Sequence, residues 1–251
     1  MKFELLIATV DDKFMQRNLL LKTSFVIVNQ LINLKKSNHT ANNIFSYQEK
    51  GLSKSRNHAL KKASADICLL TDDDISYKEN IEKIIIKAFL DNPKADIITF
   101  QIQTPDGGQF KPYLKNSYWH NYRTLMGVSS CEVAFKRKVV VESGINFDED
   151  FGLGAKYLSS EENIFLVDAL GRGLKILYIP IPIVVHPNET SSDFNRNNIQ
   201  YIKGKGAMFY RMFKSKGYFI AFLFALKQYN TSNYGFFSFF KAMLSGINEY
   251  K

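Results

Sequence analysis

An apolar run, Ile67–Thr71, ends directly in three acids, Asp72, Asp73 and Asp74. The run is typical of a buried strand, so the three carboxylates would lie close together at the end of that strand. Like charges at such range repel and raise one another's pKa unless a cation neutralises them. Oxygen clusters of this kind suit Mg²⁺ or Mn²⁺, which commonly hold a diphosphate. The alternative is a solvated acidic turn that caps the following helix.

Strands and helices alternate over the first hundred residues. This alternation predicts an α/β fold, Rossmann-like, with a mostly parallel central sheet. Ligands in such sheets bind beyond the carboxyl ends of the strands, so the acids and the loop 9–13 can border one site. The predicted strands are 2–10, 24–29, 44–47, 67–71 and 95–103, and the predicted helices are 14–21, 53–64 and 80–90.

The middle of the chain contains more loops. We expect a strand over 129–135, a helix over 137–143 and a second helix over 160–170. An acidic, glycine-bearing loop, 147–155, precedes that second helix. The extended segment 175–185 contains two prolines, which predicts an edge strand.

Composition limits the class of protein. A chain of 251 residues that is 45% hydrophobic can bury a sizeable core and is not disordered. The two cysteines, Cys68 and Cys131, lie in apolar surroundings and are expected to be buried thiols in a reducing compartment. The first ten residues are β-rich without a basic leader, so we expect a first strand rather than a secretory signal, and a cytoplasmic protein.

The net charge of +9 is concentrated in the tail, residues 195–251. This tail has nine basic residues and one acid, with nine Phe and six Tyr, whereas the remaining 194 residues carry a net charge of only +1. Basic helices rich in aromatics suit the inner surface of an anionic membrane, to which the protein would bind peripherally. The alternative is a set of helices that cap the core with solvated basic faces. Charge alone also allows nucleic-acid binding, but no motif for it is present, and none is expected.

The segment 51–75, GLSKSRNHALKKASADICLLTDDDI, resembles the donor-binding half of family 2 glycosyltransferases. These enzymes share a glycine, Arg-Asn, a short helix, an aspartate, an apolar strand and an Asp-any-Asp metal motif. The resemblance implies a GT-A fold in which residues 1–104 bind a nucleotide-sugar and residues 105–194 bind the acceptor. It also implies that Asp72 and Asp74 hold Mn²⁺ or Mg²⁺, with Asp73 between them at the donor.

The segment 147–170, FDEDFGLGAKYLSSEENIFLVDAL, resembles the acceptor-side element of the same enzymes. There a glycine-rich loop leads to a pair of acids at a helix start, and the second acid is the catalytic base. Glu162 matches the base, with Glu in place of the usual Asp, and Glu161 is its neighbour. The alternative is that both acids merely compensate the helix dipole. Whichever carboxylate acts as base must reach the proton it removes.

Further residues follow from the resemblance. His186, after the last strand, would be a third metal ligand by this resemblance; the alternative is a structural or surface histidine, which is the more common role for a lone His. Thr9, Asp11 and Arg56 would bind the nucleotide, because strand-end residues hold the nucleoside and a planar Arg suits phosphate. Asp66 would line the nucleoside pocket, or simply form a turn.

Trp119 is a candidate acceptor contact, since aromatic faces stack on sugars, although a single Trp more often packs in a core.

The resemblance therefore implies an inverting, metal-dependent glycosyltransferase. It would transfer a sugar from a nucleotide-sugar, with a UDP-sugar as the first candidate donor. The acceptor would be a saccharide or lipid-linked saccharide in cell-surface polysaccharide or glycan synthesis. One rival is a nucleotidyltransferase, which would need a glycine-rich phosphate loop that residues 10–12 lack. The other rival is a non-catalytic sugar- or membrane-binding module with the same fold.

Overall fold

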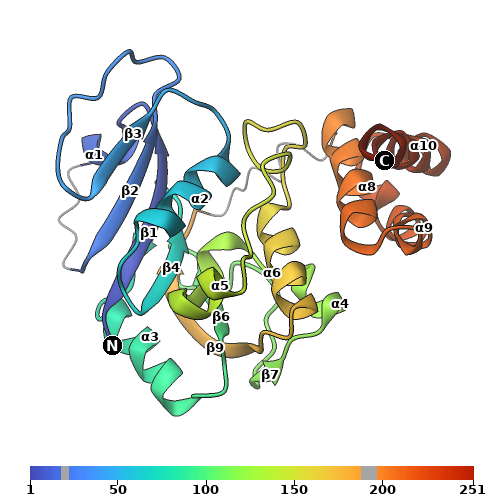
Figure 1. Cartoon of the computed structure of the whole chain (residues 1–251). Coiled ribbons are helices and arrows are strands. Elements are labelled where there is room, and N and C mark those ends of the chain that lie inside the picture. The colour runs from blue at the N-terminus through green and yellow to red at the C-terminus, as the bar shows by residue number, and fades with distance from the viewer. Residues whose placement is uncertain (18–22, 188–196) are drawn as a thin grey trace.

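The computed structural model describes residues 1–17, 23–187 and 197–251 (Figure 1). The α/β architecture predicted from the sequence is confirmed. The predicted helix over 14–21 is represented by the short α1 (Lys13–Gln16), and its later residues, 18–21, lie outside the described residues.

One nine-stranded sheet forms the centre of the molecule, in the order β3-β2-β1-β4-β8-β6-β9-β5, with β7 paired to β9. The longer pairings, β1 with β2, β1 with β4, β2 with β3 and β6 with β9, are parallel. Strand β8 runs antiparallel to both of its neighbours. The strands are β1 (Phe3–Val10), β2 (Phe25–Gln30), β3 (Ile44–Tyr47), β4 (Ile67–Thr71), β5 (Ser76–Tyr77), β6 (Ile97–Gln103), β7 (Tyr118–Trp119), β8 (Val133–Lys136) and β9 (Ile176–Val185).

The direction of the strands gathers their functional ends on one side. Strands β1, β4, β6 and β9 all point the same way, so the residues that follow them meet at one edge of the sheet. Because β8 is reversed, the segment that precedes it reaches the same edge. This segment is not the strand expected from residue 129 but a 3₁₀ turn, η1 (Ser130–Glu132), whose start is capped by Ser129 and Glu132.

Alternate residues of the strands pack into two cores on opposite faces of the sheet. Leu5, Ile7 and Leu69 pack with α3, whereas Leu6 and Leu70 pack with α2 and α6. The sheet is thus a buried layer between helices, as its apolar strands require. The helices of this part are α2 (Leu52–Lys62), α3 (Ile81–Asp91), α4 (Tyr122–Leu125), α5 (Arg137–Glu142) and α6 (Glu161–Gly171).

Strand β9 differs from the sequence expectation, because it is not an edge strand. It pairs with β6 along one side, and with the short β7 and β5 along the other. The register with β6 shifts between Thr99 and Ile102, opposite the segment that contains Pro180 and Pro182. The prolines also fall between the stretches paired with β7 and β5, so an irregular ladder accommodates their missing N–H groups.

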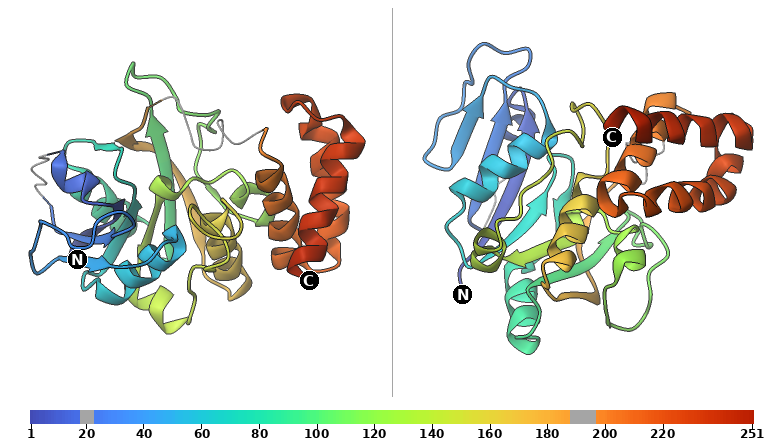
Figure 2. Two further views of the ribbon diagram at one scale, coloured as in Figure 1. Left: turned by 90° about the horizontal axis from the view of Figure 1, so that it is seen from above. Right: turned by 45° about the vertical axis from the view of Figure 1, so that its right-hand side comes forward.

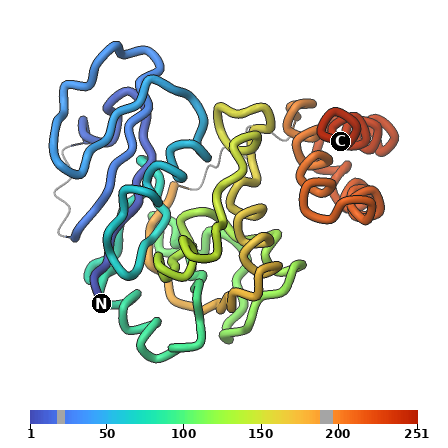
Figure 3. The backbone as a smooth tube through the Cα atoms, in the orientation of Figure 1, coloured from blue at the N-terminus to red at the C-terminus, as the bar shows by residue number. Residues whose placement is uncertain are grey.

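Residues 197–251 form three helices, α8 (Ile199–Phe213), α9 (Lys216–Gln228) and α10 (Phe236–Tyr250), with a short 3₁₀ turn, η2 (Tyr229–Thr231), before α10. They form a group beside α6, with α8 lying between α6 and the other two (Figures 1 and 2). Figure 3 shows this group standing apart from the sheet. Arg211 of α8 fastens it by donating two hydrogen bonds to Asp168 of α6 and one to Asp148. No helix over the described residues combines the length and apolarity needed to cross a bilayer.

Helices α8 and α10 approach each other at two glycines. A Cβ on Gly206 would overlap the backbone at Met243, and a Cβ on Gly246 would overlap the backbone at Lys203. The two helices therefore pack backbone against backbone at this crossing. No larger residue fits at either position unless the helices separate.

We expect Gly246→Ala to lower the free energy of unfolding by about 1–3 kcal/mol, the usual cost of overpacking. This loss should appear even though Ala favours a helix over Gly by about 1 kcal/mol. Urea unfolding followed by circular dichroism measures it. Gly127→Ala is the control, because nothing lies within 4 Å of its Cβ position and its φ is not positive, so its stability should not fall. Equal stability of Gly246→Ala and wild type would contradict the close crossing.

Candidate active site

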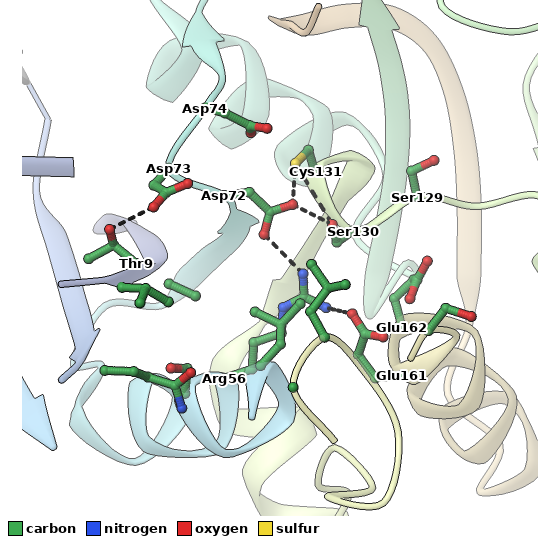
Figure 4. Close-up of a pocket in the computed structure, with 18 of the residues that line it drawn as sticks. Thr9, Arg56, Asp72, Asp73, Asp74, Ser129, Ser130, Cys131, Glu161 and Glu162 are labelled. Carbon is green, nitrogen blue, oxygen red and sulfur yellow. Dashed lines mark hydrogen bonds and ion pairs between the residues drawn. The ribbon is translucent and has the colours of Figure 1, made fainter. Parts of the chain in front are cut away.

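A cavity of about 580 Å³ opens at the carboxyl edge of the sheet. Its walls come from the ends of β1, β4 and β6, from the start of α2, from η1 and from the loop and first turn of α6. Figure 4 shows the polar side chains of this cavity from both halves of the chain facing one another. The predicted residues that line it are Thr9, Arg56, Asp72, Asp73, Asp74, Glu161, Glu162 and His186.

Arg56 of α2 stands at the centre of the cavity wall and is buried. Its guanidinium donates to Glu161 Oε1 at 2.6 Å and to Asp72 Oδ1 at 3.1 Å (Figure 4). The Arg-Asn segment, the triple acid and the acid pair of α6 are thus one contact network. Burial opposes the charge of Arg56, but the adjacent carboxylates more than compensate and raise its pKa well above the ordinary range.

Asp72 is the most firmly held of the three acids. Oδ2 accepts hydrogen bonds from Ser130 Oγ at 3.0 Å and from Cys131 Sγ at 3.2 Å, while Oδ1 accepts from Arg56. Burial alone would raise the pKa of Asp72, but the Arg56 charge and the two η1 donors outweigh it and lower the pKa. Asp72 is therefore a fixed negative charge.

Asp73 turns towards the end of β1. Its carboxylate accepts a hydrogen bond from Thr9 Oγ1 at 2.7 Å, and its backbone carbonyl accepts one from Arg17. Thr9 Oγ1 in turn accepts the N–H of Phe14. These bonds join the loops after β1 and β4, which form one wall of the cavity.

Asp74 and His186 face each other from the loops after β4 and β9, with 3.8 Å between Asp74 Oδ1 and His186 Nε2. That separation exceeds a hydrogen bond, yet one divalent ion can bridge two ligands that each lie about 2.1 Å away. Partial burial and the charges of Asp72 and Asp73 raise the pKa of Asp74, against the opposing effect of His186. A cation would relieve this repulsion.

The described side chains do not form a complete metal site by themselves. Within residues 1–17, 23–187 and 197–251, no group of three His, Cys, Asp or Glu side chains converges closely enough to hold a metal ion. Asp72 is occupied by Arg56 and η1 instead. Asp74 and His186 would supply two protein ligands to a Mg²⁺ or Mn²⁺ ion, whose other ligands would have to be water and phosphate oxygens, as is common for Mg²⁺.

Glu161 and Glu162 open α6, but they differ in environment. Glu161 is buried and paired with Arg56, whereas Glu162 has no hydrogen bond from a described side chain. Burial, followed by the charge of Glu161, raises the pKa of Glu162 to about 7. Lys205 of α8 opposes this rise and donates to Ser160 Oγ, at 2.9 Å, just before the helix. Glu162 is the carboxylate suited to exchange protons near neutral pH.

One face of α2 fastens the glycine-bearing loop that leads to these acids. Ser53 Oγ donates to the carbonyl of Phe151 at 2.6 Å, and the Asn57 side chain exchanges two hydrogen bonds with the backbone of Phe147. The backbone of Leu52 adds a further bond to Leu153. These contacts hold the loop in place, and its residues Leu153 and Gly154 line the cavity.

Three predicted site residues lie outside the cavity lining. Asp11 accepts the backbone N–H groups of residues 32–34 and so anchors the turn after β2. Asp66 precedes β4, at the opposite end of the strand from Asp72, and accepts the N–H of Lys2. Trp119 lies in β7, half-exposed, and pairs with Leu177. The structure does not bring these three to the other candidates.

Other cavity residues carried no recognisable sequence signal. Ser130 and Cys131 hold Asp72 because the reversed β8 starts at this edge, which a linear pattern does not reveal. The Gln30 side chain donates to the carbonyl of Gly51 and accepts its N–H. Ser55 Oγ is buried beside the cavity with no hydrogen-bond partner among the described residues. The prediction of buried thiols is confirmed for both Cys68 and Cys131.

Comparisons with known proteins agree with this arrangement. Residues 27–143 match the model of Glycosyl transferase family 2, which confirms the resemblance predicted from the sequence. The match includes Arg56 and the triple acid and ends before the acid pair of α6. No curated protein sequence matches the chain.

Solved structures of S. aureus TarS, residues 1–349, share the fold. The TarS complex with UDP-GlcNAc aligns with a TM-score of 0.60 and 14% identity, over 100% of this chain and 91% of TarS 1–349. A second structure of TarS 1–349 aligns with a TM-score of 0.57 and 15% identity over the same shares. The UDP complex gives 0.55 and 16%, over 92% of this chain and 72% of TarS 1–349. The central sheet thus has the Rossmann-like GT-A arrangement.

We expect Arg56→Met to lower the free energy of unfolding by about 3–5 kcal/mol, because it leaves buried carboxylates uncompensated. Adding Glu161→Gln removes one of those charges and should recover part of the loss. Urea unfolding of the wild type, both single variants and the double variant gives the coupling energy. Additive effects of the two substitutions would contradict the Arg56–Glu161 pair.

Proposed function

We propose that this chain, whose residues 27–143 match glycosyltransferase family 2, transfers a sugar from a nucleotide-sugar to an acceptor hydroxyl with inversion at the anomeric carbon. One observation carries the proposal. A single cavity contains both the acids that follow β4 and, at the start of α6, a carboxylate with a raised pKa and no side-chain partner among the described residues. Donor and acceptor chemistry can therefore meet in one place.

The donor half of the cavity suits a nucleoside diphosphate. Thr9, Gln30 and Ser55 line this half. Thr9 and Gln30 are already hydrogen-bonded within the protein, whereas the buried Ser55 hydroxyl has no partner among the described residues and can donate to a nucleoside. We take UDP-sugars as the first candidates, because TarS, which shares the fold, has been crystallised with UDP and with UDP-GlcNAc. Asp74 and His186 would hold Mg²⁺ or Mn²⁺, which when bound neutralises the charge of a departing diphosphate.

Glu162 is the proposed base. Its pKa of about 7 keeps the carboxylate available at neutral pH while leaving it basic enough to accept a proton from an acceptor hydroxyl. Glu161 is a positioning residue, because its charge is already used by Arg56 and also raises the pKa of Glu162. The loop 147–155 would shield the reacting groups from water.

The acceptor is proposed to be a saccharide or lipid-linked saccharide, as in synthesis of cell-surface glycans. Asp11, Asp66 and Trp119, which do not line the cavity, stay sequence-based predictions of donor and acceptor contacts. The nucleotidyltransferase alternative gains nothing from the fold, since the end of β1 carries Asp11 and Asp12 rather than a glycine-rich phosphate loop.

The donor site is tested by thermal unfolding with a panel of nucleoside diphosphates, with and without Mn²⁺. A ligand that binds the folded state raises the Tm, by an amount equivalent to about 2.7 kcal/mol at a hundred times its Kd. We expect UDP with Mn²⁺ to raise the Tm most, and Asp74→Asn to abolish the effect of Mn²⁺. Asp91→Asn, on the exposed end of α3, is the control that should leave it intact.

The absence of a shift with every nucleotide would contradict the proposed donor site and favour a non-catalytic module. A shift that is equal with and without Mn²⁺ would retain the nucleotide site but remove the metal from Asp74 and His186.

The base is tested with the UDP-sugar that stabilises the protein most, by measuring release of UDP. We expect Glu162→Gln to reduce turnover by about 10²–10⁴-fold while the nucleotide still raises the Tm. In the wild type, turnover should fall as the pH drops below about 7, because Glu162 becomes protonated there. Glu142→Gln, on the exposed surface of α5, should change neither property.

Lys205→Met should move the pH midpoint of turnover upwards, since Lys205 lowers the pKa of Glu162. A flat pH profile between 5 and 9, or full activity of Glu162→Gln, would be incompatible with Glu162 as the base.

A further inference from the structure

Helix α9 carries large apolar side chains on its solvent side as well as on the side that packs against the neighbouring helices. The fully buried residues of α9 are small, Gly217, Ala221 and Ala225, and the partly buried Phe224 packs beside them against Phe209 and Phe239. The side that faces solvent carries large apolar residues at helical spacing: Phe219 (65% exposed), Phe222 (38%), Leu223 (48%) and Leu226 (48%). An amphipathic surface helix usually has charged and polar residues on that outer side. The outer side of α9 is therefore an exposed apolar surface that could bury itself against an apolar partner.

The same surface continues onto α10. Phe222 meets Phe236 and Phe240 edge to face, with ring centroids 5.9 and 5.5 Å apart. Phe237, next to them, is 84% exposed, the largest exposed fraction among the apolar side chains given for the described chain. We call Phe219, Phe222, Leu223, Leu226 and Phe237 the outer apolar face.

Positive charges flank this face. Lys216 lies one turn before Phe219, Lys227 one turn after Leu223, and Lys241 one turn after Phe237, and all three are exposed. None forms an ion pair with a residue in the described part of the chain. The acid of this helical group, Glu249, is engaged with Lys203 instead. The face therefore combines large apolar side chains with uncompensated positive charge.

We infer that the outer apolar face docks onto the surface of an anionic lipid bilayer. Charge decides between a bilayer and a second copy of the chain, because pairing two such faces would bring their lysines together. A bilayer with anionic headgroups accepts both the Phe side chains at its acyl boundary and the lysines at its surface. The helices would lie on the membrane, with α8 between them and the sheet (Figure 2).

This inference is independent of the proposed sugar transfer, because it concerns α9 and α10 alone. Its test therefore uses vesicle flotation of the full chain and needs no substrate. The vesicles are phosphatidylcholine, with or without about 30 mol% phosphatidylglycerol, the anionic lipid that provides the surface charge. We expect binding to the anionic vesicles only, weakened by about 0.5 M NaCl, which screens surface charges.

The variants separate the apolar and charged contributions. Phe237→Ser should reduce partitioning about tenfold, the scale of burying one large apolar side chain. Replacing Lys216, Lys227 and Lys241 together with Gln should reduce it about a hundredfold, at roughly fivefold per lysine. The substituted side chains are exposed, so the Tm of each variant should match that of the wild type.

Two matched controls carry equivalent changes elsewhere. Leu114→Ser removes an apolar side chain that is 62% exposed in the loop before β7. Replacing the exposed Lys61, Lys94 and Lys115 with Gln changes the net charge by the same amount. Both controls should bind vesicles like the wild type.

The inference is overturned if the wild type fails to bind anionic vesicles, or if the control lysine variant loses as much binding as the tail variant. It is also overturned if sedimentation velocity shows a dimer that Phe237→Ser dissociates while vesicles are not bound. That result would assign the face to a second copy of the chain.

Discussion

The buried guanidinium of Arg56 is the interaction on which the cavity depends. It bridges Asp72, after β4, and Glu161, at the start of α6, two carboxylates more than eighty residues apart in sequence. Buried ion pairs gain little net stability, because desolvation offsets their attraction. Here the ion pairs fix geometry instead. Arg56 is the only cation that pairs with either acid among the described residues, so it sets the position of the end of β4 relative to the start of α6. The donor acids and the proposed base are thereby placed on opposite sides of one charge.

The acidic residues of the cavity therefore have different roles. Asp72 and Glu161 are committed to Arg56, and Asp73 is committed to Thr9. Asp74 and Glu162 are left with raised pKa values, since burial and neighbouring carboxylates disfavour their charge. The two acids that remain available are those expected to meet a metal ion and an acceptor proton. Pairing some acids in a cluster therefore makes its others chemically active.

The sequence predicted features that depend on neighbouring residues, but not those that depend on which distant strands pair. The apolar run ending in acids and the helix that begins with Glu161 and Glu162 predicted both walls of the cavity. The reversed direction of β8, which brings Ser130 to Asp72, depends on strand pairings that no local pattern encodes. Pro180 and Pro182 indicated an edge, but a bulged ladder accommodates them inside the sheet. Asp66 matched a family position, yet lies at the opposite end of β4.

The C-terminal helices are linked to the catalytic end by polar contacts as well as by packing. Arg211 grips Asp168 on α6, and Lys205 contacts Ser160, the residue before Glu161. Ser160 has a positive φ of 82°, which costs free energy in a residue other than glycine, and the Lys205 bond helps to hold it there. Helix α8 thus supports the start of α6 on one side and carries α9 and α10 on the other. A surface that holds the outer apolar face would therefore fix the orientation of the cavity, through one helix and without any contact to the cavity itself.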